Sequence, residues 1–247
     1  MNDKARLSKQ AGFPLYMQVT EYLQGKIESS EWQEGSKLPK EEELCRTLDV
    51  SRITLREAMK LLVLEGKLER VPGKGTFVSR RKLEQRLNRH FSFTRWATQN
   101  GIPHATRVLR AETLQCTSHI AKHLGIAEGE IVTHIERLRL GNGEPLMAEE
   151  IWVPLALCPA LHLKDLVNVP LHDVLAKDYN ITLVQAVESI EPRIADEHVR
   201  QLLYMHDPAL VHSVEHTAYT LNSQVVYFAV MKYRGDRVKF SFELTAS

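Results

Sequence analysis

The segment Val50-Ser51-Arg52-Ile53-Thr54-Leu55-Arg56-Glu57-Ala58-Met59 combines two patterns on one predicted helix. Ser51 is a suitable N-cap, because its hydroxyl can accept a hydrogen bond from a free amide of the first turn. An apolar stripe is predicted by side chains at helical spacing, namely Leu55, Ala58, Met59 and Leu62. A cationic face is formed by residues four apart, namely Arg52, Arg56 and Lys60. Such a helix suits the DNA major groove. An ordinary surface helix with solvated charges is the alternative for this segment alone.

The neighbouring segments favour the DNA interpretation. Helices are predicted from residue 14 to about 27, over 40–48 and over 51–65, where Gly66 ends the third. Residues 68–71 and 76–79 predict a hairpin around the turn Pro72-Gly73-Lys74-Gly75. Three short helices and a two-stranded wing form a winged helix-turn-helix domain, which we assign to residues 1–79.

These motifs resemble the GntR family of bacterial regulators over residues 14–79. The resemblance is carried by the 50–58 segment, by Leu38-Pro39, by Glu41-Glu42-Glu43-Leu44 and by Gly73-Lys74-Gly75-Thr76-Phe77-Val78. It implies that the DNA contacts are made by Ser51, Arg52, Thr54, Arg56, Gly73, Lys74 and Gly75. Two positions depart from the family: Lys40 replaces a frequent Ser N-cap, and Glu42 stands where several members carry an Arg that touches DNA. Because a carboxylate repels phosphate, the operator is expected to differ.

Composition indicates a cytoplasmic protein with two modules. The 247 residues suffice for a small domain and a medium one. Lys and Arg number 32 against 31 Asp and Glu, so the basic bias is local. It lies in a predicted linker, residues 80–89, with Arg80, Arg81, Lys82, Arg86 and Arg89. The scattered Cys45, Cys116 and Cys158 form no disulfide framework or zinc spacing and favour a reducing compartment. We expect no signal peptide and no membrane span.

Residues 90–247 are predicted to form an α+β module around an antiparallel sheet. Helices are expected over 83–100, 118–124, 170–179 and 196–203. Strands are expected over 106–113, 130–140, 145–153, 182–192, 209–221, 225–233 and 238–244. Most of these strands are joined as hairpins, which indicates an antiparallel arrangement.

This half resembles the UTRA domain of the HutC subfamily, which has a chorismate-lyase-like fold. The matching motifs are Ser92-Phe93-Thr94, Leu124-Gly125, Arg137-Leu138-Arg139, Gly143-Glu144-Pro145-Leu146 and Tyr233-Arg234-Gly235-Asp236-Arg237. The resemblance implies a homodimeric repressor that is released from a two-fold symmetric double-stranded operator by a small metabolite, often a phosphosugar. It implies an effector site with Ser92, Phe93, Arg137, Arg139, Glu149, His172 and Tyr233.

Arg137 and Arg139 are the strongest candidates on physical grounds. On a strand they point to the same face, roughly 6.6 Å apart. Buried guanidiniums need an anion, and Arg binds phosphate or carboxylate in a bidentate manner. The alternative is pairing with surface carboxylates at a solvated sheet edge. Glu149 is the candidate acceptor for a sugar hydroxyl. An odd-length turn around Asn142 places it on the arginines' side and a two-residue turn opposite, so we predict the odd turn.

Three positions modify the expected ligand. Pro170 and His172 stand where several sugar-phosphate-binding members carry Ser and Tyr, and Tyr227 stands where a Glu is frequent. His172 can donate to the ligand if it is suitably oriented or protonated. We predict an anionic effector with fewer contacts to sugar hydroxyls. A phosphosugar is the first choice, and a small carboxylate such as an amino-acid catabolite is the alternative.

The other histidines favour no metal and no catalysis. His119 and His123 are four residues apart on a predicted helix, but no third ligand is evident, so a surface pair is expected. His212 and His216 are expected to pack or to lie at a rim. No Ser-His-Asp or Cys-His grouping appears, and no cofactor is expected. An effector-controlled transcription factor is therefore preferred over an enzyme with a lyase-like domain and over a constitutive DNA-binding protein.

Overall fold

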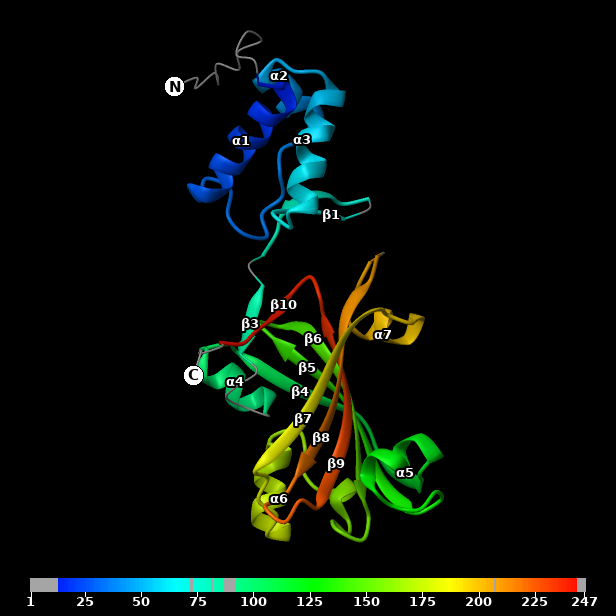
Figure 1. The fold of residues 1–247 in the computed structure, drawn as a ribbon. Coiled ribbons are helices and arrows are strands. Elements are labelled where there is room, and N and C mark those ends of the chain that lie inside the picture. The colour runs from blue at the N-terminus through cyan, green and yellow to red at the C-terminus, as the bar shows by residue number, and fades with distance from the viewer. Residues whose placement is uncertain (1–12, 72, 81, 87–91, 207, 244–247) are drawn as a thin grey trace. The chain divides into compact units, whose positions relative to one another are not determined.

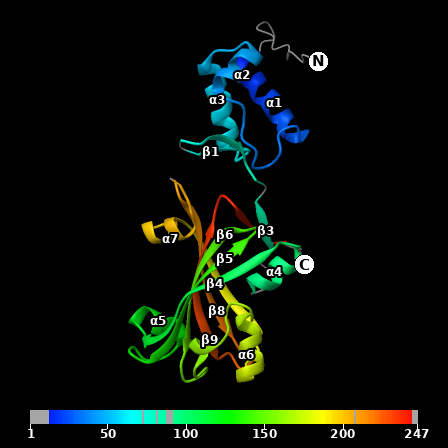
Figure 2. The same ribbon diagram turned by 180° about the vertical axis from the view of Figure 1, so that it is seen from behind.

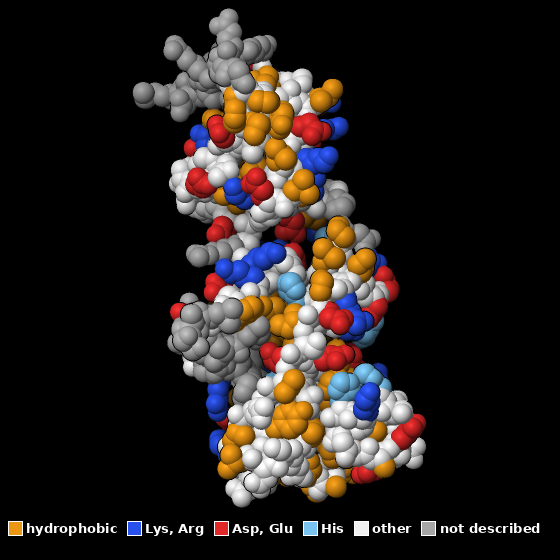
Figure 3. Space-filling model, viewed as in Figure 1, with side chains coloured by type: hydrophobic (Ala, Val, Ile, Leu, Met, Phe, Trp, Pro, Cys, Tyr) orange, Lys and Arg blue, Asp and Glu red, His pale blue; other side chains and the backbone are white. Residues whose placement is uncertain are grey.

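The computed structural model describes residues 13–71, 73–80, 82–86, 92–206 and 208–243. The chain divides into two compact units, Met1–Arg81 and Lys82–Ser247. Basic and acidic side chains lie side by side on the face of the molecule in Figure 3, in keeping with the net charge of +1.

The first unit is the predicted winged helix-turn-helix. It contains helices α1 (Leu15–Glu28), α2 (Glu41–Leu48) and α3 (Arg52–Leu64), followed by the antiparallel strands β1 (Leu68–Val71) and β2 (Gly75–Val78) (Figure 1). The apolar stripe of α3 is buried against the other helices and the wing. This core leaves the opposite face of α3, with Arg52 and Arg56, exposed to solvent.

The second unit is the predicted α+β fold, built on one antiparallel sheet of six strands. Their order across the sheet is β4 (His104–Gln115), β5 (Ile131–Gly141), β6 (Glu144–Pro154), β9 (Val225–Arg234), β8 (Leu210–Tyr219) and β7 (Gln185–Ile194). Helices α4 (Phe93–Gln99) and α6 (Leu171–Tyr179) lie on one side, and α5 (Ser118–Leu124) and α7 (Glu197–Leu202) lie on the other (Figures 1 and 2). A short 3-10 helix, η1 (Leu161–Leu163), precedes α6.

Side chains of β9 alternate between the two faces of the sheet. Tyr227 packs with the core beneath α6, and Tyr233 packs with that beneath α4, whereas Phe228 packs with the core beneath α5. Because successive strand residues point to opposite faces, odd-numbered β9 side chains face α4 and α6.

The predicted helix over 83–100 is wrong in its first part. Residues Leu83–Arg86 form strand β3, which pairs in parallel with β10 (Val238–Ser241), and the helix begins only at Phe93. Residues 87–91 lie outside the described residues. Pairing with β10, about 150 residues later in the chain, overrides the local helical pattern. The strand is also held by α4, because Trp96 Nε1 donates to the carbonyl of Glu84 at 2.9 Å.

The turn between β5 and β6 also differs from the prediction. Gly141 pairs with Glu144, so the turn has two residues, Asn142 and Gly143, both with positive φ. The predicted odd turn is therefore wrong. A β-bulge corrects the register, because Leu140 pairs with Pro145 while Arg139 pairs with Met147, which leaves Leu146 as an extra residue. Beyond this bulge, Glu149 lies directly opposite Arg137 on the arginines' face, as expected.

Candidate functional site

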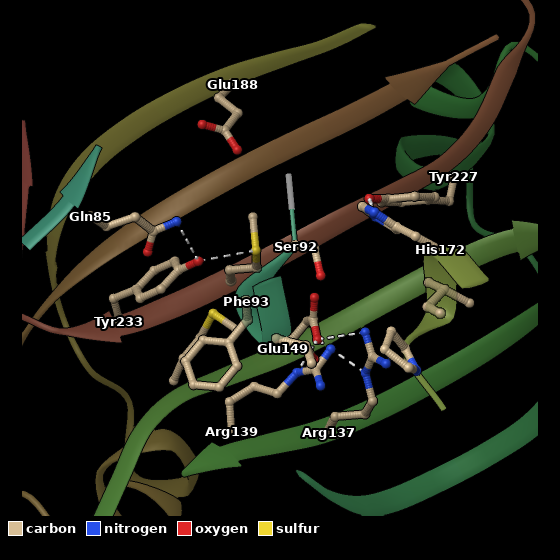
Figure 4. Close-up of a pocket in the computed structure, with 15 residues that line it drawn as sticks. Gln85, Ser92, Phe93, Arg137, Arg139, Glu149, His172, Glu188, Tyr227 and Tyr233 are labelled. Atoms are coloured by element: carbon tan, nitrogen blue, oxygen red, sulfur yellow. Dashed lines mark hydrogen bonds and ion pairs between the residues drawn. The ribbon is translucent and has the colours of Figure 1, made fainter. Parts of the chain in front are cut away.

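Arg137, Arg139 and Glu149 form a buried ionic triad on the face of the sheet that carries α4 and α6. Their exposed fractions are 1%, 5% and 8%. Glu149 Oε2 accepts hydrogen bonds from Arg137 Nε at 3.0 Å and from Arg139 Nε at 3.1 Å, and it lies 2.8 Å from Arg137 Nη2 (Figure 4). The alternative of pairing with carboxylates at a solvated edge is wrong, because the partner is buried between the two arginines.

The triad carries a net charge of +1, because two guanidiniums face one carboxylate. Burial lowers the pKa of Arg137 to about 10, although Glu149 opposes this shift. Burial acts to raise the pKa of Glu149, yet the two arginines together hold it below its usual value. Arg137 Nη1 is buried without a hydrogen-bond partner among the described residues. An unpaired buried donor in a positive site favours an anion.

The pocket over the triad is narrow. Its walls include Ser92 and Phe93 at the start of α4, Pro170 and His172 at the start of α6, and Tyr233 from β9. The cavity is about 20 Å³, which is room for roughly one water molecule. The pocket is partly open to solvent.

The start of α6 adds to the positive character of the pocket, and the contacts of Arg139 hold its guanidinium in place. Pro170 caps α6 without a side-chain hydrogen bond, and the amides of Leu171 and His172 have no acceptor within the helix. Arg139 Nη1 donates to Thr106 Oγ1 at 2.6 Å, and its guanidinium lies 5.6 Å from the ring centre of Phe93. These contacts fix Arg139, whereas Arg137 keeps one donor free for a ligand.

Ser92 and Tyr233 have internal partners. Ser92 caps α4, and its hydroxyl accepts from the amide of Arg95 at 3.5 Å. Gln85 Nε2 donates to the Tyr233 hydroxyl at 3.4 Å. The structure thus brings together all seven effector residues expected from the sequence around one cavity.

A chain of polar side chains that the sequence did not predict leads away from His172. His172 Nε2 lies 3.1 Å from the Tyr227 hydroxyl, which lies 3.1 Å from His216 Nε2, and His216 Nδ1 lies 2.8 Å from Glu188 Oε1. His216 was expected to pack or to lie at a rim; it is buried and packs against Tyr227, and its two ring nitrogens also take part in this chain. Glu188 lies directly opposite His216 on β7, so cross-strand pairing brings the two side chains together, and no local sequence signal shows it. Gln85 on β3 and Thr106 on β4, which bond to Tyr233 and Arg139, were not predicted either.

His119 and His123 pack against Phe228, with ring centres 6.1 and 4.1 Å away. Within the described parts of the chain, no group of three or more metal-ligating side chains is found. The pair is therefore explained by packing.

The stability of the second unit should decrease below pH 6.5, because of His172. Burial, reinforced by the nearby His216, lowers the pKa of His172 from 6.5 to about 4. The unfolded chain therefore binds a proton between these values that the folded protein does not, so the free energy of unfolding falls as the pH falls from 6.5 to 4. Denaturant titrations across this range should show a smaller fall for His172→Gln than for the wild type. Equal slopes would contradict the assignment of this titration to His172.

The exposed face of α3 carries the residues expected to contact DNA. Ser51 caps the helix and accepts from the Thr54 amide at 3.2 Å. The arginines are held by α2: Arg52 Nη2 lies 2.5 Å from Glu42 Oε1, and Arg56 Nε donates to Glu41 Oε2 at 2.9 Å. Glu42 thus orients an arginine besides opposing phosphate.

The wing has an exposed tip. Gly73 and Gly75 adopt φ values of 72° and 123°, and the amide of Lys74 donates to the carbonyl of Val71 at 3.0 Å. Pro72 lies outside the described residues. The turn presents Lys74 to solvent, as a contact with DNA requires.

Comparison with known proteins identifies both units. Residues 15–78 match the model for bacterial regulatory proteins of the gntR family, and residues 99–239 match the UTRA domain. The chain belongs to the GntR family. Its order of a GntR helix-turn-helix followed by a UTRA domain is that of the HutC type.

Two relatives of this GntR-family chain are named as transcriptional repressors. It is 31% identical over 234 residues to the HTH-type transcriptional repressor NagR of Bacillus subtilis (strain 168), covering 95% of this chain and 96% of that protein. It is 25% identical over 228 residues to the mannosyl-D-glycerate transport/metabolism system repressor MngR of Escherichia coli (strain K12), covering 92% and 95%.

A solved structure supports the fold. The crystal structure of PhnF from Mycobacterium smegmatis aligns with a TM-score of 0.65 at 24% identity, covering 93% of this GntR-family chain and all of that one.

None of the helices in the described ranges is long and apolar enough to cross a membrane.

Proposed function

We propose that this protein is a cytoplasmic repressor that binds a two-fold symmetric operator as a homodimer and is released by a small anionic metabolite. The observation that carries the effector assignment is the unpaired, buried Nη1 of Arg137 in a triad of net charge +1. The free amides of Leu171 and His172, at the start of α6, belong to residues that line the same pocket. An anion at this position would satisfy both.

The proposed effector is a phosphosugar, and a small carboxylate is the alternative. Phosphate and carboxylate both fit a guanidinium with a free donor. The name of MngR refers to mannosyl-D-glycerate, which contains a sugar and a carboxylate, so it supports a sugar-like effector with an anionic group. Ser92, His172 and Tyr233 would supply neutral polar contacts, and Phe93 would supply an apolar wall.

A repressor explains the site better than an enzyme does. Glu149 is held ionised by two arginines that occupy one of its oxygens. A carboxylate so stabilised is a weak base, whereas a base suited to catalysis at neutral pH has a raised pKa. The DNA-binding family of the first unit points to the same conclusion.

The narrow cavity suggests how ligand binding is transmitted. We infer that a metabolite displaces α4 or α6, whose first residues wall the pocket. Trp96 of α4 donates to the carbonyl of Glu84 in β3, and β3 begins two residues after the boundary between the units. We infer that a shift of α4 moves β3 and thereby the linker to the DNA-binding unit.

Reciprocal binding tests this function. A ligand acts on DNA binding only through a difference in its affinity for the two states, so it must bind less tightly to the operator complex. Hexose 6-phosphates and small carboxylates should be titrated into the full-length protein with and without operator DNA. The effective ligand should lose affinity by the same factor by which it weakens operator binding. Equal ligand affinity in both states, or steady conversion of the ligand to product, would contradict the proposal.

A further inference from the structure

When both of its histidines are neutral, the polar chain from Glu188 to His172 has one direction of hydrogen bonding. Glu188 is a carboxylate that can only accept, so the His216 Nδ1 atom, 2.8 Å away, must carry a proton. A neutral His216 then has an unprotonated Nε2, which accepts from the Tyr227 hydroxyl. The Tyr227 oxygen, having donated its proton, accepts from His172 Nε2–H.

The last ring of the chain therefore presents an acceptor. With its proton on Nε2, a neutral His172 has a lone pair on Nδ1. Among the described residues, this Nδ1 makes no hydrogen bond, and His172 lines the pocket. Burial keeps the ring neutral, with a pKa of about 4.

We propose that His172, set by Tyr227, His216 and Glu188, selects effectors that carry a hydrogen-bond donor beside their anionic group. This inference rests on the proposed function and specifies its ligand: a hydroxyl or ammonium group donates to His172 Nδ1 while the phosphate or carboxylate binds Arg137. It corrects the expectation that His172 donates to the ligand. A bare anion gains nothing from His172, because two acceptors face each other.

The division of roles follows from the positions of the groups. The triad and His172 lie on different elements, β5 with β6 and the start of α6, but line the same cavity (Figure 4). Tyr227 stands on β9 between His172 and His216 and stacks on His216, with ring centres 5.3 Å apart. This stacking holds the hydroxyl in place, so Tyr227 is a positioning residue.

Nitrogen NMR of the full-length protein, labelled at histidine, tests the chain directly at pH 7.5. We expect the Nε2–H tautomer for His172 and the Nδ1–H tautomer for His216. Tyr227→Phe should return His172 to a mixture of tautomers. The matched control is Tyr179→Phe, which removes an exposed hydroxyl that donates to the carbonyl of Pro159 at 2.7 Å and should change neither histidine. A His172 that carries its proton on Nδ1, or on both nitrogens, would overturn the inference.

Calorimetric titration with inorganic phosphate and with glucose, fructose and mannose 6-phosphates tests the selection. In the wild type, at least one hexose 6-phosphate should bind more tightly than inorganic phosphate. Tyr227→Phe should weaken that ligand roughly fivefold, the effect of one ordinary hydrogen bond, and leave inorganic phosphate within twofold. Equal weakening of both probes, or no weakening, would refute the role of His172 while leaving the anion site intact. If neither inorganic phosphate nor any hexose 6-phosphate binds the wild type, the phosphosugar proposed as effector is ruled out, and the selection proposed for it fails as well, whatever the tautomers are.

Discussion

Arg137→Met should reduce the affinity for inorganic phosphate roughly thirtyfold or more and abolish release from the operator. The substitution removes the free Nη1 donor and changes the charge of the triad from +1 to 0. Truncating a buried charged hydrogen-bond partner costs about 2–5 kcal/mol of binding free energy. Calorimetry with phosphate and operator-binding assays with the effector measure the two effects, and operator affinity without ligand should stay unchanged.

Glu149→Gln is the matched control for Arg137→Met. It alters the same triad and keeps nearly the shape of the replaced side chain, but it changes the net charge of the triad in the opposite direction. It raises the charge of the triad from +1 to +2, so phosphate should bind more tightly than to the wild type. Both variants should unfold more easily, since breaking a buried ion pair costs about 3–5 kcal/mol. Phosphate should therefore restore thermal stability to Glu149→Gln but not to Arg137→Met. Equal loss of phosphate binding in both variants would contradict the anion site and indicate a structural role alone.

Arg52→Ala should weaken operator binding by about 1–3 kcal/mol and reduce the selectivity for one base position. The same range applies to Arg56→Ala. Titrations at several salt concentrations separate the roles, because a residue that binds only phosphate lowers the salt slope by about one and weakens all sequences alike. Arg110→Ala, which removes the same charge from an exposed position in the other unit, should leave DNA binding unchanged.

Glu42 should modulate the DNA contact expected of Arg52. It lies 2.5 Å from Arg52, so it both restrains the guanidinium and adds negative charge near DNA. Glu42→Gln should raise the affinity for random DNA and narrow the gap between operator and random sequence. If operator affinity is unchanged in both Arg52→Ala and Arg56→Ala, these α3 residues do not contact the operator.

The winged helix-turn-helix was predictable because its signals are local. The stripe of α3, the Ser51 cap and the Gly73 and Gly75 turn lie within one continuous segment. The strands of the second unit were predicted from alternation and turn residues, with errors mainly at their ends. Strand β3 was missed, because its partner β10 lies far along the chain and the charged residues around it have helical spacing.

The triad was predictable in its members but not in its pairing. Two arginines at i and i+2 share a face on any strand, whereas the face of Glu149 depends on the Leu146 bulge as well as on the turn. No local signal distinguishes a bulged strand from an odd turn, and both place Glu149 correctly. The chain through Tyr227 and His216 joins three strands and a helix, so only the folded sheet brings it together.

The narrow pocket over the triad has a kinetic consequence for the proposed repressor. If a metabolite binds only to molecules in which α4 or α6 has moved outward, that fraction of molecules sets both its affinity and its rate of association. The observed dissociation constant is the intrinsic one divided by that fraction, and association is slower than diffusion by a similar factor. A brief rise in metabolite concentration would then cause less release of the proposed operator than a sustained rise. Substitutions that loosen the Phe93 wall would shorten this delay and tighten apparent binding together.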